Sequence, residues 1–84
     1  MVMGFNTDIQ YGGVVLHVQT EQRKDAAIET TVYRRGAVVH KLKSSYQDLL
    51  SARDFSDEQL RGRLEDQHRQ VIARIRAGEI KLPA

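Results

Sequence analysis

The chain has 84 residues, of which 40% are hydrophobic and 29% charged, with a formal net charge of +2; this is typical of one small folded domain and excludes a disordered segment. It has no cysteine, which excludes disulfides, thiolate nucleophiles and cysteine-ligated zinc. No apolar run approaches the roughly 20 residues that span a bilayer, the first residues lack the features of a signal peptide, and a cytoplasmic protein is expected.

The first half of the chain predicts strands. Residues 5–11 alternate apolar and polar side chains, as a half-buried strand does, and Gly12-Gly13 predicts a tight hairpin turn because both glycines tolerate positive φ. The return strand starts at residue 14. Three of its side chains are apolar and share the face expected to meet the core, namely Val14, Leu16 and Val18, whereas Val15 and His17 share the wetter face.

A polar, charged stretch over residues 20–27 predicts an exposed loop. Residues 28–33 and 37–43 then predict a second hairpin, closed by Arg34-Arg35-Gly36. Strict alternation along residues 37–43 places Val38 and Leu42 toward the core, and Val39 and Lys41 on the opposite face.

The second half of the chain changes to a helical period. Ser45 predicts the N-cap of a short helix over residues 46–53, with Asp48 completing a capping box. Ser56 and Gln59 predict a second capping box, at the start of a longer helix that ends near Gly78. Its apolar side recurs at three- and four-residue spacing: Leu60, Leu64, Val71, Ile72 and Ile75.

The order of these elements predicts an α+β fold. It is a four-stranded antiparallel sheet of two hairpins, followed by a short and a long C-terminal helix packed on one face. We expect one domain over residues 1–84, with a core from about 5 to 78 and tails at 1–4 and 79–84. Since one helix covers only one sheet face, the other is left for a partner. The candidate partner-binding residues are Val15, His17, Tyr33, Arg34, Arg35, Val39 and Lys41.

The three histidines do not form a catalytic or metal-binding pattern. His17 is interpreted as an ordinary histidine on a half-exposed strand, since no nucleophile is placed to work with it. Glu65 and His68 have the Glu-x-x-His spacing of carboxylate-bridged iron bundles, but such sites need a second copy and more helices. His68 and His40 are therefore expected at the border of the packed side. No catalytic residue, metal or cofactor is predicted, and the chain is not expected to be an enzyme.

A protein-interaction module or small regulatory adaptor is the first functional hypothesis. The same face could instead join two copies in a homodimer. A nucleic-acid-binding module is a third hypothesis, which the basic side chains Arg23, Lys24, Arg34, Arg35, Lys41 and Lys43 suggest. It is disfavoured because Tyr33 is the one aromatic on that face, and because charges on edge strands also protect a sheet from self-pairing.

Several motifs in combination resemble a small bacterial domain family of uncharacterised function. They are Phe-Asn-Thr-Asp at residues 5–8, His-Val-Gln-Thr-Glu at 17–21, the strand at 28–33, Ser-Tyr at 45–46 and Glu-x-Gln-His at 65–68. The loop at 21–27 departs from the glycine-containing form of that family. The resemblance implies neither an activity nor a cofactor. The chain is also similar in its small size to RomX-like accessory proteins of bacterial polarity and motility, which would imply binding to a Ras-like GTPase and a response-regulator-type scaffold.

Overall fold

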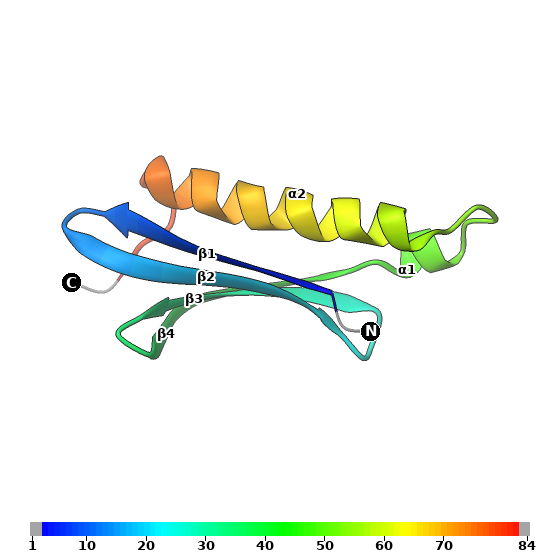
Figure 1. Cartoon of the computed structure of the whole chain (residues 1–84), viewed down its shortest axis with the longest axis horizontal. Coiled ribbons are helices and arrows are strands. Elements are labelled where there is room, and N and C mark those ends of the chain that lie inside the picture. The colour runs from blue at the N-terminus through cyan, green and yellow to red at the C-terminus, as the bar shows by residue number, and fades with distance from the viewer. Residues whose placement is uncertain (1–2, 83–84) are drawn as a thin grey trace.

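The computed structural model describes residues 3–82 and confirms the α+β fold. The strands are β1 (Gly4–Tyr11), β2 (Val14–Arg23), β3 (Ala27–Arg34) and β4 (Ala37–Ser45), followed by α1 (Gln47–Leu50) and α2 (Asp57–Arg76). They form one antiparallel sheet in the order β1-β2-β3-β4, so β1 and β4 are its edges. In Figure 1, α2 runs lengthwise over one face of the sheet, and neither of the two described helices covers the opposite face. We call this opposite surface the open face.

Two two-residue turns close the outer hairpins. Gly12 and Gly13 have φ of 59° and 82°, which confirms the predicted β1–β2 turn. In the β3–β4 turn, Arg35 and Gly36 have φ of 52° and 79°. Gly36 was expected to be the residue with positive φ. Arg35 also has a positive φ, although residues with a Cβ normally avoid this conformation because it is sterically strained.

The predicted exposed loop over residues 20–27 is wrong. Strand β2 continues to Arg23, and only residues 24–26 form the turn into β3. The polar run still alternates: Thr20 is fully buried under α2, whereas Glu21 and Arg23 are exposed on the open face. Charged side chains at every second position are compatible with a strand that has one solvent-exposed face, so a polar run alone does not indicate a loop.

Strand β4 contains a bulge that reverses one prediction. Val32 pairs with His40, but Tyr33 pairs with Val38, so Val39 is an extra residue in β4. Val39 therefore packs against the core, whereas Val38 is 52% exposed and shares the open face with Tyr33. The assignment of Val38 to the core and of Val39 to the open face is wrong, because strict alternation does not hold across a bulge.

The two helices differ in how well the sequence specified them. Ser56 and Gln59 form the predicted capping box of α2, and Gly78 follows its C-cap with a φ of 73°. Helix α1 is a single turn, shorter than the predicted 46–53. Its N-cap position is Tyr46, which makes no side-chain cap, and the hydroxyl of the predicted cap Ser45 accepts from the Gln47 N–H at 3.2 Å. Asp48 does not complete a capping box there; its carboxylate instead accepts a 2.7 Å bond from Arg63 of α2.

The core between the sheet and α2 consists of two hydrophobic clusters. One contains Ile9, Leu16, Val18, Val32, Val71, Ile75 and Ile80. The other contains Ala26, Ile28, Tyr46, Leu60 and Leu64. Ile80 is 7% exposed, so the predicted tail at 79–84 is wrong at this residue. Residues 1–2 and 83–84 of the predicted tails lie outside the described part of the chain.

Candidate functional site

The strand register brings most of the predicted site residues together on the open face. His17 lies opposite Asp8 on one side and opposite Tyr33 on the other, and Tyr33 lies opposite Val38. Val15 is two residues from His17 and therefore on the same face. Val15 and Val38 are 44% and 52% exposed. We call Val15, His17, Tyr33 and Val38 the apolar patch. Sequence reasoning found three of these four residues and missed Val38, because no sequence signal marked the bulge.

His17 is held by its neighbour on β1. Its Nδ1 lies 2.6 Å from Oδ1 of Asp8, and both side chains are substantially exposed. This hydrogen bond joins β1 and β2 across the sheet. The aspartate occupies one ring nitrogen, so His17 is anchored at the border of the apolar patch.

Arg34 and Arg35 lie beside the apolar patch, at the β3–β4 turn. Together with residues of the other hairpin they line a shallow depression of about 270 Å³, whose remaining walls are Gly13, Val14, Val15 and His17. Two predicted arginines thus flank two predicted patch residues. An acidic or polar group could approach the guanidinium groups while an apolar group contacts Val15.

The β3–β4 hairpin carries charge of one sign beyond its first residues. Residues 30–45 contain Arg34, Arg35, Lys41 and Lys43 and no Asp or Glu. Lys41 lies opposite Thr31 on the open face and is exposed, as expected. Because the chain as a whole has a net charge of only +2, this hairpin concentrates positive charge at one edge of the sheet.

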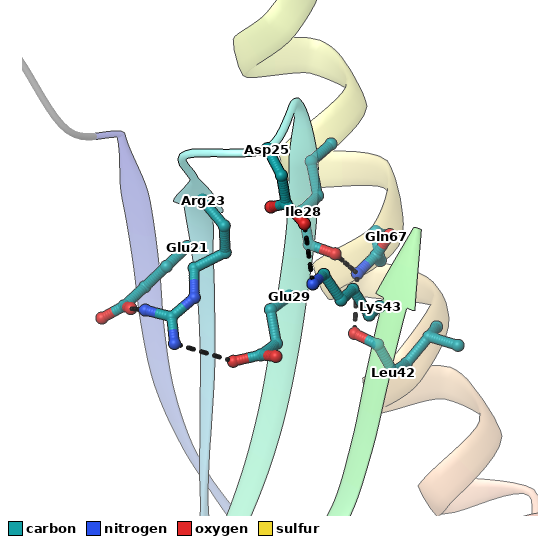
Figure 2. Close-up of polar contacts among 8 residues, drawn as sticks. All are labelled: Glu21, Arg23, Asp25, Ile28, Glu29, Leu42, Lys43 and Gln67. Carbon is teal, nitrogen blue, oxygen red and sulfur yellow. Dashed lines mark hydrogen bonds and ion pairs between the residues drawn. The ribbon is translucent and has the colours of Figure 1, made fainter. Parts of the chain in front are cut away.

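The opposite end of the open face is occupied by internal ion pairs, drawn in Figure 2. Arg23 lies between two glutamates, 3.2 Å from Glu21 and 3.2 Å from Glu29. Lys43 donates to Asp25 at 3.0 Å, and this hydrogen bond holds the pKa of the Asp25 carboxyl below its ordinary value. These charges satisfy one another, so this end has less to offer a partner than the apolar patch.

A buried polar layer crosses the core between the two hydrophobic clusters. Its buried members are Thr20, Thr30, Gln67 and His68, and it ends at the exposed Thr7 of β1 and the half-buried Ser44 of β4. The Gln67 amide nitrogen donates to Thr30 Oγ1 at 3.0 Å and also faces the carbonyl oxygens of Ile28 and Leu42, as Figure 2 shows for the two carbonyls. The Ser44 hydroxyl donates to the Gln67 oxygen. Carbonyl oxygens can only accept, so they fix the orientation of the amide.

The same logic assigns the protons of His68. Thr30 accepts from Gln67 and can donate to Thr20, at 2.7 Å. Thr20 then donates to His68 Nδ1 at 2.7 Å, and Nε2–H donates to Thr7 at 2.8 Å. This direction satisfies the hydroxyl hydrogens of Thr20 and Thr30 and corresponds to a neutral imidazole. Burial lowers the pKa of His68, which favours the same neutral form.

His68 and Gln67 were missed as interior residues. His68 was expected at the border of the packed side, but it is 5% exposed and its ring lies 5.9 Å from that of Phe5. Gln67 was named only as part of the Glu-x-Gln-His motif, with no role in the interior, and it is 7% exposed. The available signal was their position on α2 between Leu64 and Val71, which places them on the apolar side of the helix.

The histidines and carboxylates are dispersed. Within residues 3–82, no three His, Asp or Glu side chains gather in a way that could hold a metal ion. Neither described helix combines the length and apolar character that a bilayer span requires. Comparison with protein-family models, with curated proteins and with solved structures returned no match.

Proposed function

We propose that this domain is a non-enzymatic protein-interaction module that binds its partner through the apolar patch and the arginines beside it. The observation that carries the proposal is the position of Val15 and Val38. They are two of the three large hydrophobic side chains that the described residues expose, and they flank Tyr33 and His17 on a face that no described helix covers. Exposed apolar residues that gather on one face are typical of interaction surfaces.

The surroundings of the patch support a partner with acidic groups around an apolar centre. Arg34 and Arg35 line the depression next to Val15, and Lys41 lies further along the same face. Interfaces commonly have an apolar centre with a charged rim, and arginine and tyrosine are frequent energetic anchors in them.

A pair of substitutions tests the proposal. Val15→Asp with Val38→Asp places two charges in the patch, and affinity capture from the source cell should then lose the partners that the parent chain retains. The matched control is Leu50→Asp, which changes the third exposed hydrophobic side chain, at 47% exposure, on α1. Equal thermal midpoints of the three proteins exclude unfolding as the cause. Recovery of the same partners by the double variant would contradict the proposal.

The homodimer hypothesis concerns the same face, and the mass of the purified chain in solution distinguishes it from binding of another protein. Light scattering of the purified chain at micromolar concentration gives a dimer mass if two copies join through the patch, and Val15→Asp with Val38→Asp then restores the monomer. A monomer in both cases leaves the patch to another protein. The relation to Ras-like GTPase regulation stays a prediction from resemblance, for which binding of the purified GTPase is the direct measurement.

A further inference from the structure

We infer that the β4 edge of the sheet is a second docking site, which binds an extended acidic segment of a partner protein as a fifth strand. This site is distinct from the apolar patch, because it uses the backbone of the edge strand rather than the open face. Three independent observations carry the inference: the outward backbone groups of β4, the charge of the hairpin, and a groove beside β4 on the helix side.

The hydrogen-bond pattern determines which backbone groups of β4 point outward. The Tyr46 N–H donates to the Ala26 carbonyl at 2.8 Å, immediately beyond the pair Ala27–Ser45. Hydrogen-bonded pairs alternate along an antiparallel ladder, so the residues that bond to β3 are the even-numbered ones from His40 onward. Lys41, Lys43 and Ser45 therefore direct their N–H and C=O groups away from the sheet. Because the bulge at Val39 disturbs the first part of β4, the regular edge runs from residue 40 to 45.

The charge of the edge selects the partner. Lys41 projects to the open face from an outward-pointing position, and residues 30–45 contain no acidic side chain. Lys43 projects to the same face, and its ammonium already donates to Asp25 at 3.0 Å, so Lys41 carries most of the attraction for an acidic partner. Antiparallel pairing of β4 with β4 of a second copy would place these lysines of both copies on one face, where like charges repel. A strand with carboxylates at alternate positions would instead oppose them with complementary charge.

The helix side of the same edge offers room for the other side chains of such a strand. A groove of about 400 Å³ lies between β4 and α2, and its walls include Leu42, Ser44, Asp66 and Gln70. Leu42 is only partly buried, whereas Leu16 and Val32, on the strands nearer the middle, are fully buried. The His40 Nε2 atom, on this side of β4, is buried and has no hydrogen-bond partner among the described residues. A fifth strand would cover the exposed part of Leu42, which lines the groove.

A synthetic ligand tests the inference directly. The probe is a blocked ten-residue peptide of alternating glutamate and valine, which presents carboxylates to Lys41 on the open face and valines to the groove. Controls are a peptide of alternating lysine and valine, and a glutamate–valine peptide in which each residue type forms one block. Titration followed by amide resonances of the labelled domain should show saturable shifts over residues 40–45 with the alternating acidic peptide alone.

Two matched proline variants identify the edge. Lys41→Pro removes an outward N–H from β4 without removing a hydrogen bond to β3. It should weaken binding of the acidic peptide by about tenfold or more. Asn6→Pro does the same at the opposite edge, since β1 pairs through its odd-numbered residues, as the bond from Gln22 N–H to the Met3 carbonyl shows. It should leave binding unchanged. Should Lys41→Pro fail to fold, Lys41→Glu with Lys43→Glu should reverse the preference toward the lysine peptide.

The outcomes separate this inference from the proposed function. Retention of peptide binding by Val15→Asp with Val38→Asp supports an edge site independent of the apolar patch. The inference is overturned if the acidic peptide gives no shifts at millimolar concentration, if Lys41→Pro and Asn6→Pro bind equally, or if the shifts centre on Val15 and Tyr33. It is also overturned if the chain self-associates and Lys41→Pro abolishes that association, because the occupant is then a second copy.

Discussion

The hydroxyl of Thr20 joins three parts of the molecule. It lies 2.7 Å from the Thr30 hydroxyl on β3 and 2.7 Å from Nδ1 of His68 on α2, and the residue is fully buried. Such a group costs more to remove than its hydrogen bonds contribute, because its former partners remain buried without a replacement.

We therefore expect Thr20→Val to lower the free energy of unfolding by about 1–3 kcal/mol, although valine has nearly the shape of threonine. Urea unfolding at pH 7.5 measures the change. Thr31→Val is the matched control on the opposite face of β3, and its effect should be smaller. An equal loss of stability in both variants would contradict a specific contribution of the Thr20 hydrogen bonds to the free energy of unfolding.

The buried imidazole of His68 makes the stability of the fold depend on pH. Burial lowers the pKa of His68 in the folded chain, whereas an unfolded histidine titrates near 6.5. Below about pH 6.5 the unfolded chain thus binds more protons, so the stability of the fold should fall as pH decreases from 7.5 to 5. Urea unfolding across this range should show that fall in the parent and in His17→Gln. His68→Gln should reduce it, and an unchanged pH dependence there would contradict the assignment.

At the residue scale, the sequence indicated apolar core positions better than polar ones. Leu16, Val18 and Ile75 are fully buried, and each occupies a position that the local strand or helix period predicts to face the core. Thr20, Gln67 and His68 are buried because their partners come from distant parts of the chain, and a local pattern carries no information about such partners.

At the element scale, the β3–β4 turn contains an avoidable conformational cost. Arg35 has a φ of 52°, and the next residue, Gly36, is also left-handed. Asparagine tolerates this region better than arginine, and Asn-Gly is the favoured pair for this kind of turn. Arg35→Asn should stabilise the domain by about 0.5–1 kcal/mol in thermal or urea unfolding. Arg34→Asn, at the end of β3, is the control and should give no gain.

If Arg35→Asn stabilises the fold but weakens partner capture, the arginine is retained for binding at the expense of turn geometry. A loss of stability would show instead that contacts of the Arg35 side chain outweigh the strain of its backbone.

The bounds of an element were predicted correctly where a turn or capping residue marks its end in the sequence. Gly12-Gly13 specified one hairpin, and Ser56 with Gln59 specified the start of α2. The bulge at Val39 escaped prediction because nothing in Ala-Val-Val-His distinguishes a regular strand from one with an extra residue. That single residue changed the membership of the candidate site, since it exchanged Val38 and Val39 between the two faces.

At the scale of the whole molecule, the two hydrophobic clusters lie along one continuous helix and one sheet. Leu64 is fully buried in the second cluster, and replacing such a leucine by alanine costs about 2–5 kcal/mol. A domain of 84 residues has a total stability of roughly 4–13 kcal/mol. We therefore expect Leu64→Ala to remove a large share of the stability of the domain, measurable as a lower urea midpoint.

Amide hydrogen exchange measures whether the two clusters unfold together. In Leu64→Ala, protection should fall in β1 and β2 around Ile9 and Leu16 as well as near the substitution, because the polar layer ties both clusters to α2. Loss of protection confined to the neighbourhood of Leu64 would mean that the clusters are separate unfolding units.

The polar layer also determines where α2 can rest on the sheet. Two smooth apolar surfaces can slide past each other, and a shift of one helical turn, about 5.4 Å, would exchange one aliphatic contact for another at little cost. Here the same shift would carry Gln67 away from its carbonyl and hydroxyl partners and would bury it against aliphatic side chains. The hydrogen bonds thus favour one alignment of helix and sheet, because a shifted alignment would leave the buried Gln67 amide without its partners.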